Sequence, residues 1–319
     1  MESFRHISAK DPRIASLRQD MDVHGYVMIR GLLSVEDLNP LLSDITAMLR
    51  DAGWLRPDSS LMERIANVTA ECADEDQAYK IVRDNIFSLQ SFHAFPHHRL
   101  LLRVMKLLVG EQLLIHPKSE IRVIFPNFAR GIVHAHQDHT AIAGDEESFT
   151  AWIPLHDCPV VQGPLRVLDG SHRFGPQPTA GETGYIPPGA EQGRNWVGGD
   201  INAGDVLLFH SLTVHEALPN RSSRFRISLD CRFQSYARVV DPGALVFAGS
   251  GKRSWECTYA RWTSDELELK YYWTKLPLRL KPSMAELAEL ARTCESPKMR
   301  ERYARILERL ESQAICPNR

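Results

Sequence analysis

The chain has 319 residues, with 38 Lys and Arg against 40 Asp and Glu, so its formal net charge is −2. This balance gives no reason to expect nucleic acid or an anionic membrane as a partner. The six cysteines are scattered, no apolar stretch approaches the roughly 20 residues that span a bilayer, and residues 1–21 lack the apolar core of a secretory signal. We therefore expect a reduced, cytoplasmic, soluble protein with one large domain or two.

The first third of the chain is predicted to be mainly helical. Residues 25–33 read as a short strand that ends in a turn, and Ser34 with Asp37 resembles a helix-capping box, which starts a helix that ends near Leu49. Further helical patterns cover residues 62–68, 76–89 and 100–109. We expect this helical part, about residues 1–115, to precede a β-rich core at about 116–240.

The β-rich core is indicated by short apolar runs with turn residues between them, a pattern typical of an all-β sandwich or barrel. The predicted strands are 121–125, 132–136, 149–155, 165–168, 206–209 and 225–233. In the last run, apolar residues alternate with polar ones, so one face must pack on an apolar layer and the other must meet polar groups. This alternation places Arg226 and Ser228 on the same polar face.

Two regions outside these strands attract attention. Residues 175–199 form a loop rich in Gly and Pro, which we interpret as a lid over the substrate, although a surface excursion without a role is the alternative. After Val240 the chain is again helical, and we expect residues 241–319 to form an extension packed on the core. Its predicted helices are 264–273, 283–292, where a capping box at Ser283 and Glu286 opens the helix, and 297–313.

The most informative residues lie in the segment 133–139. In an extended strand, His134, His136 and Asp138 share one face, so His136 and Asp138 can bind the same metal ion. Two imidazoles and a carboxylate on one face of the metal are typical of non-haem Fe(II) oxygenases. His215, 77 residues beyond Asp138, is the candidate for the third ligand.

Arg226 follows His215 by 11 residues and offers a planar set of donors that suits a carboxylate. His134 leaves an alternative open, a three-histidine cupin site with His136 and His215. Cupins, however, have a glutamate about four residues after the HxH pair, where this chain has Thr140. We therefore favour His136, Asp138 and His215 as the metal ligands.

These motifs make the chain resemble the phytanoyl-CoA hydroxylase (PhyH) family of Fe(II)- and 2-oxoglutarate-dependent oxygenases. Five blocks appear in the family's order: GYVMIRGLL (25–33), HQD (136–138), AWIPLHDCPVVQGPLRVLDGSHRFG (151–175), GDVLLFHSLTVHEALPN (204–220) and RFRIS (224–228). The resemblance implies a double-stranded β-helix, a cupin-like jelly roll, with helical segments before and after it. It also implies Fe(II), 2-oxoglutarate and O2 as cofactor and cosubstrates.

The resemblance assigns residues as well. It implies iron on His136, Asp138 and His215, the far carboxylate of 2-oxoglutarate on Arg226, Trp152 along the cosubstrate, and Ser228 as part of the family's Arg-x-Ser. The chain departs from the family at Ala217, where relatives often carry a serine that touches the cosubstrate. Residues 1–240 would form the oxygenase domain. Arg194 and Trp196 in the loop, and Arg122 in strand 121–125, are candidate substrate contacts.

The resulting functional prediction is an oxygenase that hydroxylates or desaturates a small molecule and releases succinate and CO2. Asp138 disfavours a halogenase, because related halogenases have a small residue there that leaves room for chloride. The alternative is a metal-binding cupin-like protein with a binding or sensing role and no oxygenase activity. The aromatic residues between 255 and 273 most simply pack in a core, and a homodimer contact there is left open.

Overall fold

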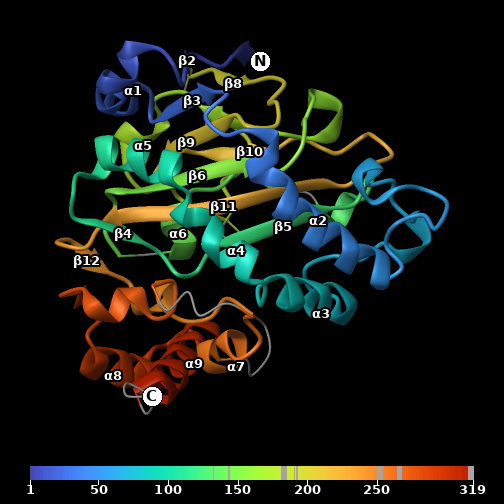
Figure 1. The fold of residues 1–319 in the computed structure, drawn as a ribbon. Coiled ribbons are helices and arrows are strands. Elements are labelled where there is room, and N and C mark those ends of the chain that lie inside the picture. The colour runs from blue at the N-terminus through green and yellow to red at the C-terminus, as the bar shows by residue number, and fades with distance from the viewer. Residues whose placement is uncertain are drawn as a thin grey trace.

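The computed structural model describes residues 1–131, 133–142, 144–180, 185–189, 191, 193–249, 254–263 and 268–314. Two β-sheets face each other, and helices cover the outer face of the larger one (Figure 1). This arrangement is a jelly-roll core with flanking helices, as predicted. No helix among the described residues has both the length and the apolar character needed to cross a membrane.

The larger sheet has the order β2 (His6–Ser8), β3 (Tyr26–Arg30), β9 (Val206–His210), β6 (Ser148–Pro154), β11 (Arg226–Ser235) and β4 (Leu113–Ile115), and β5 (Glu120–Ile124) also pairs with β11. The smaller sheet has the order β1 (Glu2–Ser3), β8 (Trp196–Gly198), β7 (Leu165–Leu168) and β10 (His215–Ala217). Apolar side chains from both inner faces fill the space between the sheets, Trp152 and Phe209 from the larger and Leu165 and Val167 from the smaller.

Strand β11 has the alternation that its sequence predicts. Ile227, Leu229 and Phe233 are fully buried in the core cluster that the outer face of the large sheet shares with the helices. The intervening residues Arg226, Ser228, Asp230 and Arg232 point into the jelly roll and are buried as well. Because successive side chains of a strand face opposite ways, a single strand supplies both the apolar support and a row of polar groups inside the barrel.

The helices on the outer face are α1 (Leu17–His24), α2 (Val35–Asp51), α3 (Gln77–Ile86), α4 (Gln90–Ala94) and α5 (Arg99–Val109). Helix α2 starts at the predicted capping box, with Ser34 and Asp37 bonded reciprocally. The prediction of a helix at residues 62–68 was wrong. Two 3-10 turns, Leu61–Glu63 and Val68–Ala70, flank Arg64, whose backbone is left-handed (φ 54°), and Ile65 between them bridges to Arg224. Pairing of Ile65 with the residues just before β11 therefore takes the place of the predicted helix.

The C-terminal extension contains η8 (Pro242–Ala244), α7 (Trp255–Tyr259), α8 (Met284–Thr293) and α9 (Pro297–Ala314), and its β13 (Arg279–Leu280) pairs with β12 (Val239–Val240). Helix α8 has the predicted capping box. The helix expected at 264–273 lies partly outside the described residues, and the described part is a turn followed by a 3-10 helix at Tyr272–Lys275.

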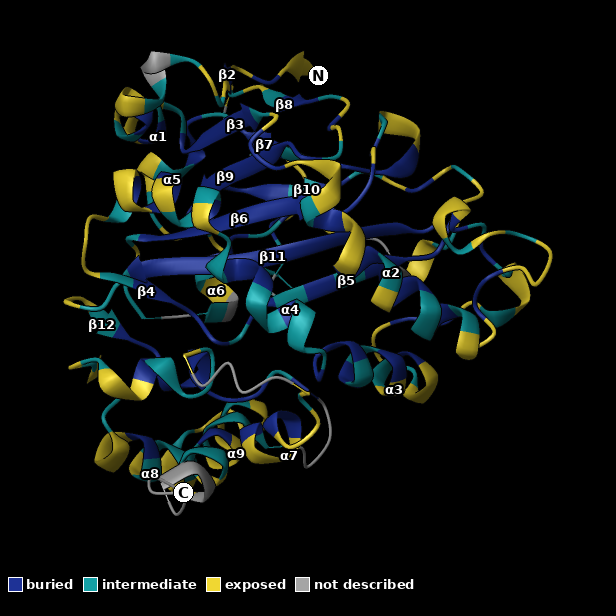
Figure 2. Cartoon of the chain, viewed as in Figure 1, coloured by how far each residue is buried: buried dark blue, intermediate teal, exposed yellow. Residues whose placement is uncertain are grey.

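Aromatic side chains join the extension to the rest of the molecule. The Trp262 indole donates to the Ser88 carbonyl (3.2 Å), and the Tyr272 hydroxyl donates to the Ile115 carbonyl (2.9 Å). Trp255 and Trp273 are buried in the same cluster as the outer face of the large sheet. The aromatic residues thus pack against the turn at Ser88, the helix α4 and the edge strand β4. Figure 2 shows that the strands of the core are mostly buried, while the surrounding helices also carry exposed residues.

Candidate active site

His136, Asp138 and His215 come together inside the jelly roll. One ligand atom from each lies within 4.8 Å of the others, and they form the one group of this kind among the described residues. Asp138 and His215 are buried, and His136 is partly exposed. The backbones of His136 and His215 exchange two hydrogen bonds of 3.0 Å each, so the two imidazoles are held side by side.

The hydrogen bonds of both imidazoles leave the same nitrogen available. Nδ1 of His136 lies 2.8 Å from the His134 carbonyl oxygen, and Nδ1 of His215 lies 3.0 Å from the Thr213 carbonyl oxygen. A carbonyl oxygen can only accept, so each Nδ1 carries the proton and each Nε2 keeps a free lone pair. Burial, together with the neighbouring His215, lowers the pKa of His136 to about 3, so the ring is neutral at neutral pH. Neutral imidazole is the form that binds metals.

Asp138 is held in its ionised form. Burial alone would raise its pKa, but the charge of Arg232 and a hydrogen bond from Thr150 lower the pKa well below its usual range. Arg232 reaches both carboxylate oxygens, with Nη2 3.3 Å from Oδ1 and Nε 3.4 Å from Oδ2. The side chains of both partners are less than a tenth exposed. The donor set therefore fits a divalent cation.

The sequence predicted that His136 and Asp138 lie close together because they share one face of a strand. The two residues are close, but the predicted strand is wrong. Residue 132 lies outside the described residues, and 133–136 form no regular strand apart from the bridge between His136 and His215. Asp138 instead begins a one-turn helix, α6 (Asp138–Ile142). The carboxylate therefore reaches the histidines because of this helical turn and the hydrogen bonds from Arg232 and Thr150, and not because of strand alternation.

Arg226 is 1% exposed and has no carboxylate within ion-pair distance among the described residues. Its Nη1 donates to the Ser228 hydroxyl at 2.8 Å, and its Nε, also buried, has no partner. The guanidinium faces a cavity of about 320 Å³ lined also by Ile124, Phe128 and Leu218. A buried cation without a counter-ion is costly, so this arrangement fits a ligand that brings a carboxylate.

The cavity beside Arg226 depends on a close backbone contact. Gly163 has a φ of 76°, and a Cβ at this position would lie 2.2 Å from the Leu218 carbonyl oxygen and 2.9 Å from the Asn220 nitrogen. Only glycine fits there without moving the chain. Gly163 thus allows the segment 218–220, which forms one wall of the cavity, to lie against the turn that precedes β7.

Two further inner residues carry buried polar atoms without partners. Trp152 is 1% exposed and its Nε1 is unpaired, and Oδ1 of Asp230, the residue opposite it in the strand pairing, is unpaired too. Arg122 faces the same space from β5, and its guanidinium approaches Asp230 (3.9 Å) and Asp74 (3.2 Å). Burial raises the pKa of Asp230 to about 6 against the opposing charge of Arg122.

Arg194 and Trp196 do not lie with these groups. Trp196 pairs with Leu168, so its ring is on the outer face of the smaller sheet, whereas His215 pairs with Val167 and points inward. The Trp196 ring packs under the Arg166 guanidinium (4.4 Å), and the Arg194 guanidinium lies over the Phe174 ring (3.3 Å). Their predicted contact with substrate is untested, and the structure does not bring them to the metal ligands.

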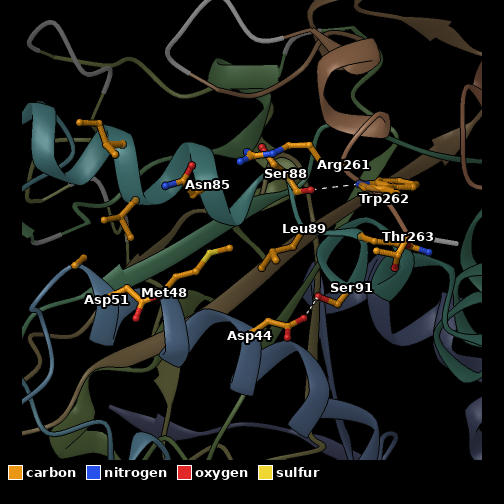
Figure 3. A pocket seen from close by; sticks show the side chains of 14 residues that line it. Asp44, Met48, Asp51, Asn85, Ser88, Leu89, Ser91, Arg261, Trp262 and Thr263 are labelled. Carbon is orange, nitrogen blue, oxygen red and sulfur yellow. Dashed lines mark hydrogen bonds between the residues drawn. The ribbon is translucent and has the colours of Figure 1, made fainter.

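A roomier cavity than the one beside Arg226 lies elsewhere. It has about 650 Å³ and is formed by α2, α3, α4 and residues 261–263 (Figure 3). Across it Ser91 donates to Asp44 (2.6 Å) and Trp262 donates to the Ser88 carbonyl. None of its lining residues comes from a jelly-roll strand, so its size does not make it the site of the chemistry.

Sequence reasoning missed Arg232 and Thr150, the two residues that hold Asp138. The alternation of β11 did place Arg232 on the same face as Arg226, which was a usable signal. It could not show the partner, because Asp138 is 94 residues away in sequence.

Comparison with known proteins decides the family. The model of the phytanoyl-CoA dioxygenase (PhyH) family matches residues 21–228. The chain belongs to the phytanoyl-CoA dioxygenase family. It is therefore an enzyme, a 2-oxoglutarate-dependent dioxygenase that uses Fe(II), 2-oxoglutarate and O2. The alternative of a binding or sensing protein without oxygenase activity is set aside by this finding.

Individual relatives agree with the family. The 1-deoxypentalenic acid 11-beta-hydroxylase of Streptomyces arenae is 29% identical in an alignment 232 positions long, which covers 67% of this chain and 78% of the relative. A phytanoyl-CoA dioxygenase of Arabidopsis thaliana is 30% identical in an alignment 102 positions long, which covers 30% of this chain and 36% of the relative.

Solved structures show the same fold. One is the epimerase SnoN in complex with Fe3+, alpha ketoglutarate and nogalamycin RO, with a TM-score of 0.56 and 22% identity. The match covers 76% of this chain and 94% of the SnoN chain. The non-heme monooxygenase ThoJ has a TM-score of 0.51 at 18% identity and covers 69% and 77%.

Proposed function

We propose that this dioxygenase hydroxylates a small organic molecule at an iron held by His136, Asp138 and His215, with release of succinate and CO2. The observation that carries the proposal is the position of the three ligand atoms within 4.8 Å, with both imidazoles fixed by Nδ1 bonds to carbonyl oxygens. Such outer bonds orient a ligand and set its tautomer before the metal binds. Three protein ligands would leave positions on a bound Fe(II) free for other ligands.

When bound, Fe(II) supplies the activation of O2 that a protein side chain cannot. The other tasks fall to residues of the chain. Arg226 would bind the far carboxylate of 2-oxoglutarate through its paired donors, and Ser228 holds the guanidinium in place at 2.8 Å. Trp152, with its unpaired indole N–H, would contact the cosubstrate. The buried inner face keeps water away from these groups.

Hydroxylation is preferred to desaturation because the Streptomyces arenae relative, which the chain matches over 78% of its length, is named a hydroxylase. The substrate of that relative, 1-deoxypentalenic acid, is the first compound to test. The residues that determine substrate choice need not be shared at 29% identity. A wider panel of terpenoid and aliphatic compounds is therefore required.

The test is anaerobic reconstitution followed by turnover. We expect one Fe(II) per chain, 2-oxoglutarate binding that requires the iron, and succinate formation that rises when the right compound is added. Mass spectrometry should then show one added oxygen atom in the product. A wild-type protein that binds no iron, or binds it equally well after His136→Ala, would contradict the proposed site. A product that has lost two hydrogens would favour desaturation.

A further inference from the structure

A third, strongly polar cavity adjoins the Asp138 side of the proposed iron site. It has about 100 Å³ and is lined by His116, Lys118, Glu120, Arg122, Ile142, Arg232, Gly243, Ala244 and Arg302. Arg232 connects it to the iron site, because the same guanidinium holds both oxygens of Asp138. Ile142 connects it again, as the last residue of the helix that Asp138 begins.

Cations dominate the lining, with four Lys and Arg side chains against the single carboxylate of Glu120. Three of the four already have interactions: Arg232 with Asp138, Arg122 with Asp74 and Asp230, and Arg302 with a neighbouring group. Lys118 is different. Among the described residues, no carboxylate lies within ion-pair distance of its ammonium group, although this side chain is partly buried.

Lys118 also feels the other cations. Burial lowers its pKa, and the charges of Arg232 and Arg302 lower it further, while Glu120 acts in the opposite direction. An anion in the cavity would relieve this repulsion. The carboxylate of Asp241 lies near Lys118 and Arg302, and it accepts a hydrogen bond from the Gly243 amide (2.7 Å). Together with Glu120, it keeps the excess positive charge of the cavity small. A single carboxylate is therefore a better match than a phosphate dianion.

We propose that this cavity is an anion subsite in which Lys118 and Arg302 bind the carboxylate of the substrate, so that the enzyme acts on a carboxylic acid. The inference rests on the proposed function, since the subsite selects what the iron site oxidises. The volume of about 100 Å³ holds the acid group alone, because ligand pockets for whole small molecules span about 300–1,000 Å³. The remainder of the substrate extends toward the metal ligands.

The position of the subsite restricts which carbon is oxidised. Helix α6 rises about 1.5 Å per residue, so Ile142 in the cavity lining lies roughly 6 Å along the helix from Asp138. A carboxylate bound beside Ile142 therefore presents a carbon several bonds away to the iron. We expect oxidation of a remote carbon and not of the carbon next to the acid group.

The C-terminal extension completes the subsite. Arg302 comes from α9, and Gly243 and Ala244 come from η8, the 3-10 turn that α9 contacts. Both elements follow residue 228, where the match to the family model ends. The extension is thus a specificity element, which supplies a wall and a charge to a site whose other groups come from the jelly roll.

The test compares acids with matched neutral and phosphorylated compounds. Enzyme loaded with Fe(II) and 2-oxoglutarate under nitrogen is titrated calorimetrically with a panel of terpenoid and fatty acids, their methyl esters, and the phosphate monoesters of the corresponding alcohols. We expect acids to bind more tightly than esters or phosphates. Lys118→Met and Arg302→Met should each weaken acid binding roughly 10–100-fold, the range for hydrogen bonds to charged groups.

A matched control is available on the same helix. Arg300 is exposed and is not part of the cavity lining, so Arg300→Met should change acid affinity by no more than about twofold. Equal binding of esters and acids, acid affinity unchanged in both variants, or no acid in the panel that binds would overturn the subsite. Tighter binding of phosphates would overturn the choice of carboxylate. If the wild-type protein fails to bind iron, the proposed function is contradicted and not the subsite. Acid binding can then still be measured on the metal-free protein.

Discussion

The two ends of the inner face of β11 carry arginines in opposite states. Arg232 is paired with Asp138 through two nitrogen–oxygen contacts, and Thr150 completes the arrangement. Arg226, six residues earlier on the same face, has a hydroxyl as its partner and no carboxylate within ion-pair distance among the described residues. Both guanidiniums are almost fully buried.

The Arg232 guanidinium has its counter-ion within the protein, whereas the Arg226 guanidinium has none and is available to a ligand. At the Arg232 end, the positive charge keeps Asp138 ionised and oriented, so the metal ligand exists before the metal arrives. At the Arg226 end, the fold tolerates an uncompensated cation, a cost that a bound carboxylate would offset. The contrast predicts that the two arginines respond differently to substitution, in stability as well as in activity.

The largest effect is expected from loss of a metal ligand. Asp138→Ala and His136→Ala should reduce turnover by more than the about 10–100-fold typical of outer-shell partners, because a ligand atom itself is missing. Succinate formation and iron content measure this. Circular dichroism should show that both variants still fold, and near-native turnover in Asp138→Ala would remove that residue from the site.

Arg226→Met should raise the KM for 2-oxoglutarate roughly 100-fold, because two charge-assisted hydrogen bonds are lost. Arg226→Lys keeps the charge and loses the paired geometry, so it should raise this constant less but in the same direction. The constant for the organic substrate should change little in either variant. Equal changes in both constants would count against the assignment.

Arg232→Met should lower the free energy of unfolding by about 3 kcal/mol, since it leaves the buried carboxylate of Asp138 without its counter-ion. Arg226→Met should leave the stability of the ligand-free protein within about 1 kcal/mol of wild type or raise it, because no partner is left behind. Urea unfolding of the metal-free proteins measures both. The double variant Arg232→Met with Asp138→Ala should recover much of the loss, and an additive result would show that the pair is not coupled.

Asp230 gives a prediction in pH. Burial raises its pKa to about 6, above its ordinary value of 3.8, so between these two values the folded protein binds more protons than the unfolded chain. The stability contributed by this group is then fully present below about pH 4 and is lost as the pH rises through 6. The free energy of unfolding of Asp230→Asn, measured relative to wild type on the metal-free proteins, should therefore be higher at pH 7 than at pH 4 by on the order of 1–3 kcal/mol. A pH-independent difference between variant and wild type would refute the raised pKa.

The smallest effect is expected at the loop residues. Trp196 lies on the outer face of the smaller sheet, so Trp196→Ala and Arg194→Ala should change turnover by less than about threefold, as for surface substitutions. A large fall in turnover without a change in 2-oxoglutarate affinity would restore the idea that the loop 175–199 closes over the substrate.

Much of the fold could be predicted because its signals are local. The alternation in residues 225–233 and the capping boxes at Ser34 and Ser283 depend on near neighbours, and all three are present in the structure. Predictions failed where distant pairing overrode local preference. Ile65 bridges to Arg224 instead of joining a helix, and 133–136 form a bridge with β10 in place of a regular strand.

The sequence by itself determined which residues are available for the chemistry: two histidines, an aspartate and a buried-strand arginine in an order shared with a known family. Their side chains dictate the kind of metal and cosubstrate, because donor type and charge are properties of the residues themselves. Only the tertiary structure decided that Arg232 holds Asp138, that Arg226 has no counter-ion, and that Lys118 and Arg302 face one cavity. Those facts depend on contacts between segments up to 184 residues apart, and the alternation of a strand specifies a face without specifying what lies opposite it.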